Sequence, residues 1–191
     1  MVNYQDIYAT LSRIASAAND PSVSVPSINI TGLSMPESMQ HIAGLYLVSL
    51  TRYHEAVTRG GEQSTVGYNE LRQAVEILIA ARKCICSWGG SYQFGMFAFS
   101  PEESDDVMVS LSLQEFDQFT RTNIYMLIGR AAICTEQSDS DIYQFSSWID
   151  LQLHSLSMFC VAHDIDLAYI IYQIYQQNKT ISNEPSVPTA E

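Results

Sequence analysis

One dense cluster of histidine and aspartate occurs in the sequence: His163 with Asp164 and Asp166. Histidine nitrogens and carboxylate oxygens bind metal ions, so this cluster could hold a cation if other segments supplied further ligands. The same residues also fit a tight turn between two helices, where an aspartate accepts hydrogen bonds from the first amides of the second helix. We expect Asp164 or Asp166 to cap the second helix.

The cysteines are not spaced for a structural metal site. No Cys-x-x-Cys pair occurs, although such pairs are typical of structural zinc sites. Each cysteine lies among apolar residues, where free thiols pack as small hydrophobic groups. We therefore expect reduced core thiols at four positions: Cys84, Cys86, Cys134 and Cys160.

Motifs of common enzyme classes are missing from the sequence. The chain has no Glu-x-x-His pair, no His-Glu-x-x-His zinc motif, no P-loop and no dinucleotide-binding glycine fingerprint. The acids at 102–106 lack the alternating spacing and the closing glutamate of a calcium loop. The residues therefore predict no catalytic group, no metal site and no resident cofactor.

Basic side chains concentrate on two predicted helices, so an anionic ligand could bind between them. The alternative is that they pair at the surface with the more numerous acids. The basic residues concerned are Arg52, His54, Arg59, Arg72, Arg82 and Lys83.

The overall charge limits the partners. The 191 residues include 21 acids and 9 Lys or Arg, a net charge of −12. This charge repels nucleic-acid phosphates and offers no basic face to anionic membranes, but it suits basic proteins, metal ions or metal-bound nucleotides. It also fits a protein that only needs to stay in solution. A DNA mimic would need acids along one face, and these acids are spread through the chain.

The location expected from the sequence is the cytoplasm. The N-terminus lacks the basic and apolar regions of a secretory signal. No stretch of about 18 apolar residues could form a transmembrane helix.

Hydrophobic periodicity predicts a mainly α protein, a bundle of five or six helices in a single domain over 1–180. Residues 181–191 are predicted to form a disordered tail. Ser34 and Glu37 have the spacing of a capping box, and Gly129 inside a helix indicates close packing of a neighbour. The helices are expected at about 3–19, 34–60, 65–88, 113–135, 138–163 and 167–180.

One segment has strand periodicity instead. Apolar residues alternate over 92–98 and again over 107–113, with a polar turn between the two runs. The pattern predicts a short β-hairpin insertion at about 91–113.

The C-terminal region resembles a known family. Residues 158–167, which read MFCVAHDIDL, resemble the helix, short turn and Ile-Asp-Leu helix start of the all-α NTP pyrophosphatases. This family includes the MazG-like enzymes and the dimeric dUTPases. The resemblance covers about 148–179, with Asn178 where the family often has an asparagine, and implies a helical fold that binds nucleotides with Mg²⁺.

The metal ligands of that family are missing from this chain. The family holds Mg²⁺ with Glu-Glu-x-x-Glu on one helix and Glu-x-x-Asp on the next. Aligned on the C-terminal turn, the Glu-x-x-Asp positions are Trp148 and Leu151, and Asp150 is one residue out of phase. No Glu-Glu-x-x-Glu run occurs upstream, so we expect no hydrolysis by this mechanism.

Two functions therefore stay open. The first is a non-enzymatic acidic helical protein that acts through protein–protein interaction or self-association as a homo-oligomer, because its 11 tyrosines and its methionines suit interfaces. The alternative is a nucleotide-binding or pyrophosphatase-like protein of the all-α NTP pyrophosphatase type, either active or degenerate. Only this alternative requires Mg²⁺ as a cofactor. Its nucleotide would contact Asn178 and Lys179, with Arg72 or Arg82 facing the phosphates.

Overall fold

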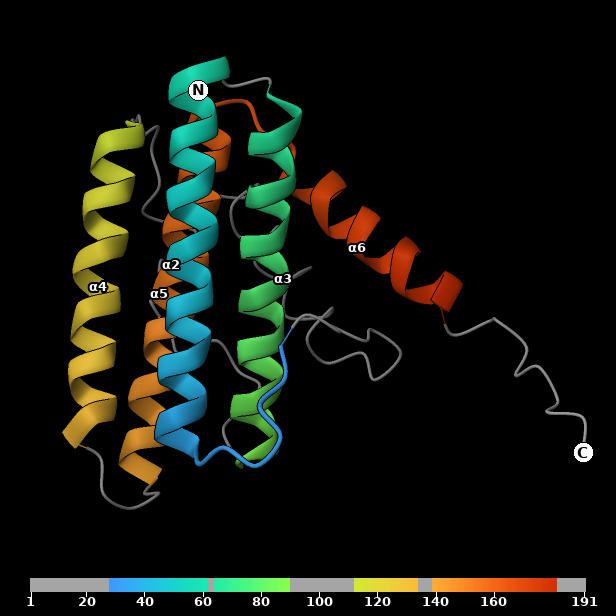
Figure 1. The fold of residues 1–191 in the computed structure, drawn as a ribbon. Helices are drawn as coiled ribbons and strands as arrows, with labels where there is room; N and C mark the ends of the chain where they lie inside the picture. The colour runs from blue at the N-terminus through green and yellow to red at the C-terminus, as the bar shows by residue number, and fades with distance from the viewer. Residues whose placement is uncertain (1–27, 62–63, 90–111, 134–138, 182–191) are drawn as a thin grey trace, which may run out of the picture.

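The computed structural model describes residues 28–61, 64–89, 112–133 and 139–181. Their helices are α2 (Met35–Gly60), α3 (Thr65–Ser87), α4 (Leu113–Ile133), α5 (Asp139–Ala162) and α6 (Leu167–Ile181) (Figure 1). The mainly helical class predicted from the sequence is confirmed for this part of the chain. The helix predicted at about 3–19 and the predicted tail beyond residue 181 lie outside it.

Four of the helices form a bundle, and α6 leaves it at an angle (Figure 1). Within the bundle α2 and α5 each contact both α3 and α4, and neighbouring helices run antiparallel. The last helix packs on α3 and α5 through Leu167, Ile170, Ile171 and Ile174, which are buried. None of the described helices is long and apolar enough to cross a membrane.

Capping boxes begin two of the helices. The Ser34 amide donates to Glu37 Oε2 over 2.8 Å, and the Glu37 amide donates back to Ser34 Oγ, which confirms the predicted box at α2. Ser112 and Glu115 form the same arrangement at α4, with distances of 2.9 and 3.2 Å. Hydrogen bonds from the two serines lower the pKa of both glutamates. Each box satisfies amides that a helix N-terminus would otherwise leave unpaired.

The box at α4 corrects one end of the predicted β-hairpin. Most of that hairpin, predicted at about 91–113, lies outside the described residues. Its last two positions are described by the structure. Ser112 immediately precedes α4, and Leu113 is the first residue of that helix. The reason is local, because the Ser112–Glu115 box favours a helix start over the end of a strand. The described residues contain no strand.

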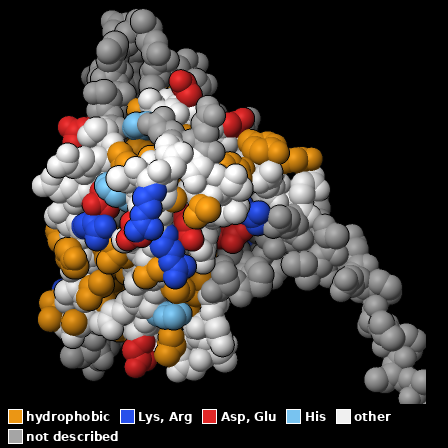
Figure 2. Space-filling view, turned by 45° about the horizontal axis from the view of Figure 1, so that its top comes forward, with side chains coloured by type: hydrophobic (Ala, Val, Ile, Leu, Met, Phe, Trp, Pro, Cys, Tyr) orange, Lys and Arg blue, Asp and Glu red, His pale blue; other side chains and the backbone are white. Residues whose placement is uncertain are grey.

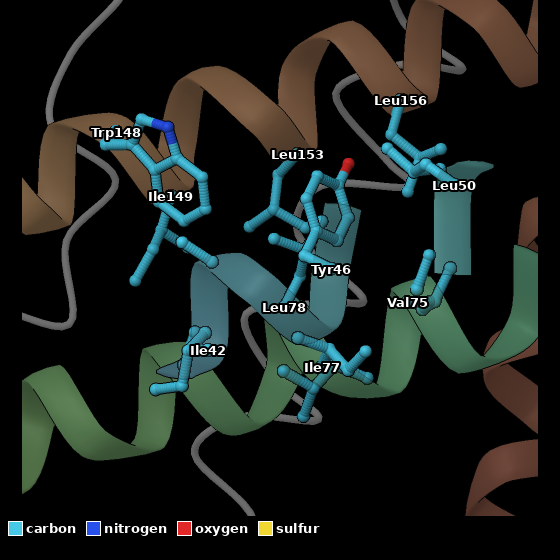
Figure 3. Close-up of a cluster of buried hydrophobic side chains, with 14 of the residues drawn as sticks. Ile42, Tyr46, Leu50, Val75, Ile77, Leu78, Trp148, Ile149, Leu153 and Leu156 are labelled. Atoms are coloured by element: carbon cyan, nitrogen blue, oxygen red, sulfur yellow. The ribbon is translucent and has the colours of Figure 1, made fainter. Parts of the chain in front are cut away.

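The core lies between the four bundle helices (Figure 3). Tyr46 of α2 meets the edge of Trp148 of α5, with ring centroids 6.2 Å apart. Further along the bundle, Phe159 of α5 stacks on Phe116 of α4 at 4.4 Å and meets the edge of Tyr53 at 5.9 Å. The apolar residues that recur at helical spacing along α5 are all buried: Ile142, Phe145, Ile149, Leu153, Leu156 and Cys160.

The described cysteines are free thiols. Cys160 is buried in the core, whereas Cys84 and Cys86 are partly buried, and Cys134 lies outside the described residues. Burial raises the pKa of the Cys84 thiol to about 11 and also raises the pKa of Cys160. Both thiols therefore stay protonated at neutral pH and pack as small apolar groups.

Tyr46 gives a test of the core. Its side chain is fully buried, and within the described region its hydroxyl has no hydrogen-bond partner. Burial raises the pKa of this phenol. We predict that Tyr46→Phe keeps or increases the free energy of unfolding, by up to about 1 kcal/mol, because the buried hydroxyl gains no bond in return for its lost hydration.

The measurement is urea denaturation, with Tyr68→Phe as the matched control. The Tyr68 hydroxyl donates to Gln173 Oε1 over 2.9 Å, so its removal should cost about 1 kcal/mol. A loss of more than 1 kcal/mol from Tyr46→Phe would contradict the packing described here.

Candidate functional site

A buried ion pair joins the third and fifth helices. Arg82 of α3 is only 1% exposed, and its Nη1 lies 2.5 Å from Oδ1 of the buried Asp150 in α5. Arg82 belongs to the apolar stripe of its helix, so the guanidinium enters the bundle, where an uncompensated charge would be very costly. The pair therefore fixes two helices that are not consecutive in the chain.

Other acids are used in the same structural way. Asp117 accepts from Arg121 Nε over 2.8 Å, and the same guanidinium reaches Thr51 of α2 at 3.2 Å. Asp141 of α5 accepts from Arg130 of α4 over 2.6 Å. These contacts tie α4 to α2 on one side and to α5 on the other.

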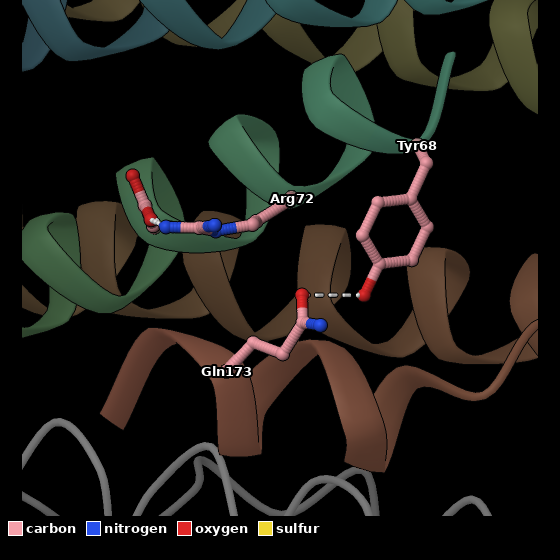
Figure 4. Close-up of polar contacts among 4 residues, drawn as sticks. Tyr68, Arg72 and Gln173 are labelled. Atoms are coloured by element: carbon pink, nitrogen blue, oxygen red, sulfur yellow. Dashed lines mark hydrogen bonds and ion pairs between the residues drawn. The ribbon is translucent and has the colours of Figure 1, made fainter. Parts of the chain in front are cut away.

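Polar contacts between α3 and α6 lie close to the predicted nucleotide site (Figure 4). The Tyr68 hydroxyl donates to Gln173, and partial burial raises the pKa of this phenol. One turn along α3, Arg72 donates from Nε and Nη2 to Glu76 Oε1, at 3.1 and 2.9 Å. The guanidinium of Arg72 is therefore held by a carboxylate on its own helix.

The four predicted nucleotide-binding residues do not all meet. Arg72 lies on α3, which packs against α6, and Asn178 and Lys179 belong to the last turns of α6, where their side chains lie outside the described part. Arg82 is ten residues further along α3 and faces Asp150 inside the bundle. Its placement gives it a structural partner in place of a phosphate, and nucleotide binding by the other three stays a prediction.

The His-Asp cluster forms the predicted turn. Asp166 Oδ1 accepts from the amide of Tyr169 over 2.9 Å, so the capping role is confirmed for this residue. Asp164 occupies the left-handed region with φ 55°, and the His163 ring lies 4.4 Å from the ring of Phe159. Among the described residues, no group of three or more His, Cys, Asp or Glu side chains is placed to hold a metal ion.

Unlike the charged sites described above, one exposed surface, on α4, consists of uncharged residues. We call it the α4 outer face and define it by six residues: Phe119, Thr122, Tyr125, Met126, Gly129 and Ile133. Tyr125 is 63% exposed, Met126 68% and Ile133 69%. Hydrophobic side chains gather at the left of Figure 2, on the side where α4 stands in Figure 1. Single exposed apolar residues are ordinary, but a contiguous group of this kind is typical of a binding surface.

The arginines at the edges of this face are paired with aspartates. Arg121 pairs with Asp117 on its own helix, reaches Thr51 of α2 and also interacts with Tyr125, while Arg130 pairs with Asp141 of α5. The residues in the middle of the α4 outer face carry no charge themselves, although the whole chain carries −12.

Gly129 in this face contradicts the close neighbour expected from the sequence. It is exposed, and a Cβ built on it would meet no atom of the described residues within 4 Å. A glycine inside a helix costs about 0.5–1 kcal/mol relative to alanine. No packing among the described residues explains that cost.

The α4 outer face is not among the sites predicted from the sequence, because it contains no catalytic or anion-binding residue types. A signal was available, since no charged residue occurs over 122–129 in a protein rich in acids. The Arg82–Asp150 pair was also missed, although the arginine sits on an apolar stripe and Asp150 follows the inward Ile149. Charged residues on buried stripes need partners.

Comparison of the chain with protein-family models, with curated proteins and with solved structures gave no match. The resemblance of the C-terminal helices to the all-α NTP pyrophosphatases therefore stays a prediction. Trp148, at one of the family's ligand positions, is buried against Tyr46, and its Nε1 donates to the Asn123 carbonyl over 3.1 Å.

We predict that Asp150→Asn lowers the free energy of unfolding by about 3–5 kcal/mol, because it leaves the buried Arg82 charge without its anionic partner. Replacing both members together, Arg82→Met with Asp150→Leu, should recover at least half of that loss. The control is Asp117→Asn, in a partly exposed pair, which should cost less than about 1 kcal/mol. Urea denaturation of the four proteins measures these values. Equal losses of unfolding free energy for Asp150→Asn and Asp117→Asn would show that the buried pair matters no more to stability than the partly exposed one.

Proposed function

We propose that this protein works by binding protein chains, itself included, through the α4 outer face. The observation that carries the proposal is the exposure of Tyr125, Met126 and Ile133 on one uncharged side of a helix. Tyrosine and methionine are enriched at protein interfaces, while charged residues are depleted at interface centres. The apolar area that such a face removes from water on binding favours association.

The use of the carboxylates supports the same proposal. Asp117, Asp141 and Asp150 each accept a hydrogen bond from an arginine, and Glu37 and Glu115 cap helices. Hydrolysis assisted by Mg²⁺ needs several carboxylates directed at one ion. In this chain these acids instead neutralise guanidinium groups and helix ends at separate places in the fold.

Photo-crosslinking tests whether the face binds protein. A benzophenone amino acid replaces Tyr125 in the full chain, and a matched variant carries it at Val66, which is 62% exposed on α3. We expect ultraviolet light to join the Tyr125 variant to a protein in the cells that make it, and the Val66 variant much less. The readout is the mass of the products on a denaturing gel and by mass spectrometry. Absence of any protein adduct at position 125 would contradict the proposed function.

Nucleotide turnover provides the second test. We predict no release of pyrophosphate or phosphate from NTPs and dNTPs, with Mg²⁺ or Mn²⁺, because Asp150 and Glu76 are engaged with arginines. Turnover by the wild type that is lost in Arg72→Ala would instead favour the pyrophosphatase-like alternative, since Arg72 lies on α3 beside α6. The control is Arg59→Ala, at an exposed arginine that pairs only weakly on α2.

A further inference from the structure

We infer that the α4 outer face binds the same face of a second copy of this chain, with the two α4 helices antiparallel about a two-fold axis at Met126. This inference rests on the proposed function and gives it a specific partner and geometry. Three observations carry it: the absence of charge on the face, the spacing of its large residues, and an exposed glycine without a neighbour.

The charge of the chain favours a copy over a different partner. A basic protein would be attracted to the acidic surface as a whole, yet the middle of this face has no acid with which to pair. Two copies, each carrying −12, repel one another where their acidic surfaces meet. They can associate most readily where both surfaces are uncharged, and at the edges of this face the charges of Arg121 and Arg130 are each neutralised by an aspartate.

The large residues of the face repeat with a heptad spacing. Phe119, Met126 and Ile133 are seven residues apart, and the smaller Thr122 and Gly129 lie between them. A repeat of seven residues keeps one line of a helix facing a partner helix, as in coiled coils. The line is about 21 Å long, at 1.5 Å for each residue.

The large residues are spaced symmetrically about Met126. An antiparallel copy places its Ile133 opposite Phe119, while the two Met126 side chains meet at the axis. Its Gly129 falls opposite Asn123, one residue from Thr122. Each pair then occurs twice, as a two-fold interface requires. The five levels alternate large, small, large, small and large in both directions along the line.

Among the described residues, charge also favours the antiparallel direction. Within α4 the carboxylate on this line is Glu115, at the N-terminal end of the helix, which it caps. Parallel helices would place the two Glu115 side chains against each other. Antiparallel helices separate them by about 33 Å, because each lies eleven residues from the axis. The opposed helix dipoles favour the same direction.

Gly129 allows the two helices to approach closely. A missing side chain in the middle of an exposed helix weakens the helix, and no described residue fills the space above it. In the second copy Thr122 lies within one residue of this level, so the glycine leaves room for the threonine and for the bulky residues on either side.

The first test is the mass of the full chain in solution. Sedimentation velocity at micromolar concentration should give about twice the 21.4 kDa of one chain. Met126→Glu, which brings two carboxylates together at the axis, should raise the dissociation constant roughly a hundredfold. Val66→Glu introduces the same charge at an equally exposed site on α3 and should leave the dimer intact. A wild type of 21.4 kDa at 100 micromolar, or equal dissociation by both variants, would overturn the inference.

A second variant separates association from folding. Gly129→Leu should increase the helical stability of one chain, because leucine is the better helix former and its Cβ meets no atom. The same side chain should keep the two helices apart and weaken the dimer at least tenfold. A protein that melts at a higher temperature and sediments as a monomer is the expected outcome. An unchanged dissociation constant would count against close approach at Gly129 and so against this geometry.

Disulfide trapping tests the direction of the helices, in a background with the native cysteines replaced by serine. Met126→Cys alone should form a disulfide between two chains. Phe119→Cys and Ile133→Cys should each stay reduced alone, but the two proteins mixed should cross-link. Disulfides of Phe119→Cys with itself would overturn the antiparallel arrangement. If the benzophenone at Tyr125 captures a protein of another mass while the chain sediments as a monomer, the proposed function stands and this inference fails.

Discussion

A guanidinium inside a helical bundle has to be neutralised where it lies, and this requirement fixes how the helices fit together. Arg82 belongs to α3 and its anion, Asp150, to α5, so the pair sets the rotation of both helices. With those rotations, Tyr46 meets Trp148 and Phe159 stacks on Phe116 across the core. An ion pair of this kind gives little net stability compared with apolar packing. Its main effect is to exclude arrangements of α3 and α5 in which the buried guanidinium would have no anionic partner.

Pairs of arginine and aspartate also explain why the α4 outer face carries no unpaired charge. Arg121 and Arg130 are the two basic residues of α4. Arg121 pairs with Asp117 on the same helix and donates to Thr51 of α2, whereas Arg130 pairs with Asp141 of α5. The side of α4 opposite the core is left with Tyr125, Met126 and neighbouring uncharged residues. A strongly acidic chain thereby keeps an apolar area at its surface, which suits contact with a surface of similar character.

Local signals in the sequence predicted much of the described fold. The helix periods and the Ser34–Glu37 box gave α2 within a residue of its observed bounds, and the capping by Asp166 was also predicted. The equivalent signal at Ser112 and Glu115 was overlooked because alternating apolar residues before it favoured a strand. The Arg82–Asp150 pair could not be predicted from local signals, because the two residues are 68 positions apart in the chain and their contact depends on how α3 and α5 face each other. Gly129 was assigned a neighbour, although a buried and an exposed glycine look alike in a sequence.

The central claim is that the α4 outer face is covered by protein when the molecule is at work. Hydroxyl-radical footprinting measures this directly, because Met126 and Tyr125 react quickly when exposed, as they are in the single chain. We expect both residues to react several times more slowly at high protein concentration than at nanomolar concentration, while exposed Tyr169 on α6 reacts at the same rate at both concentrations. Equal rates for Met126 at the two concentrations, in a protein that also captures no other protein at this face, would contradict it.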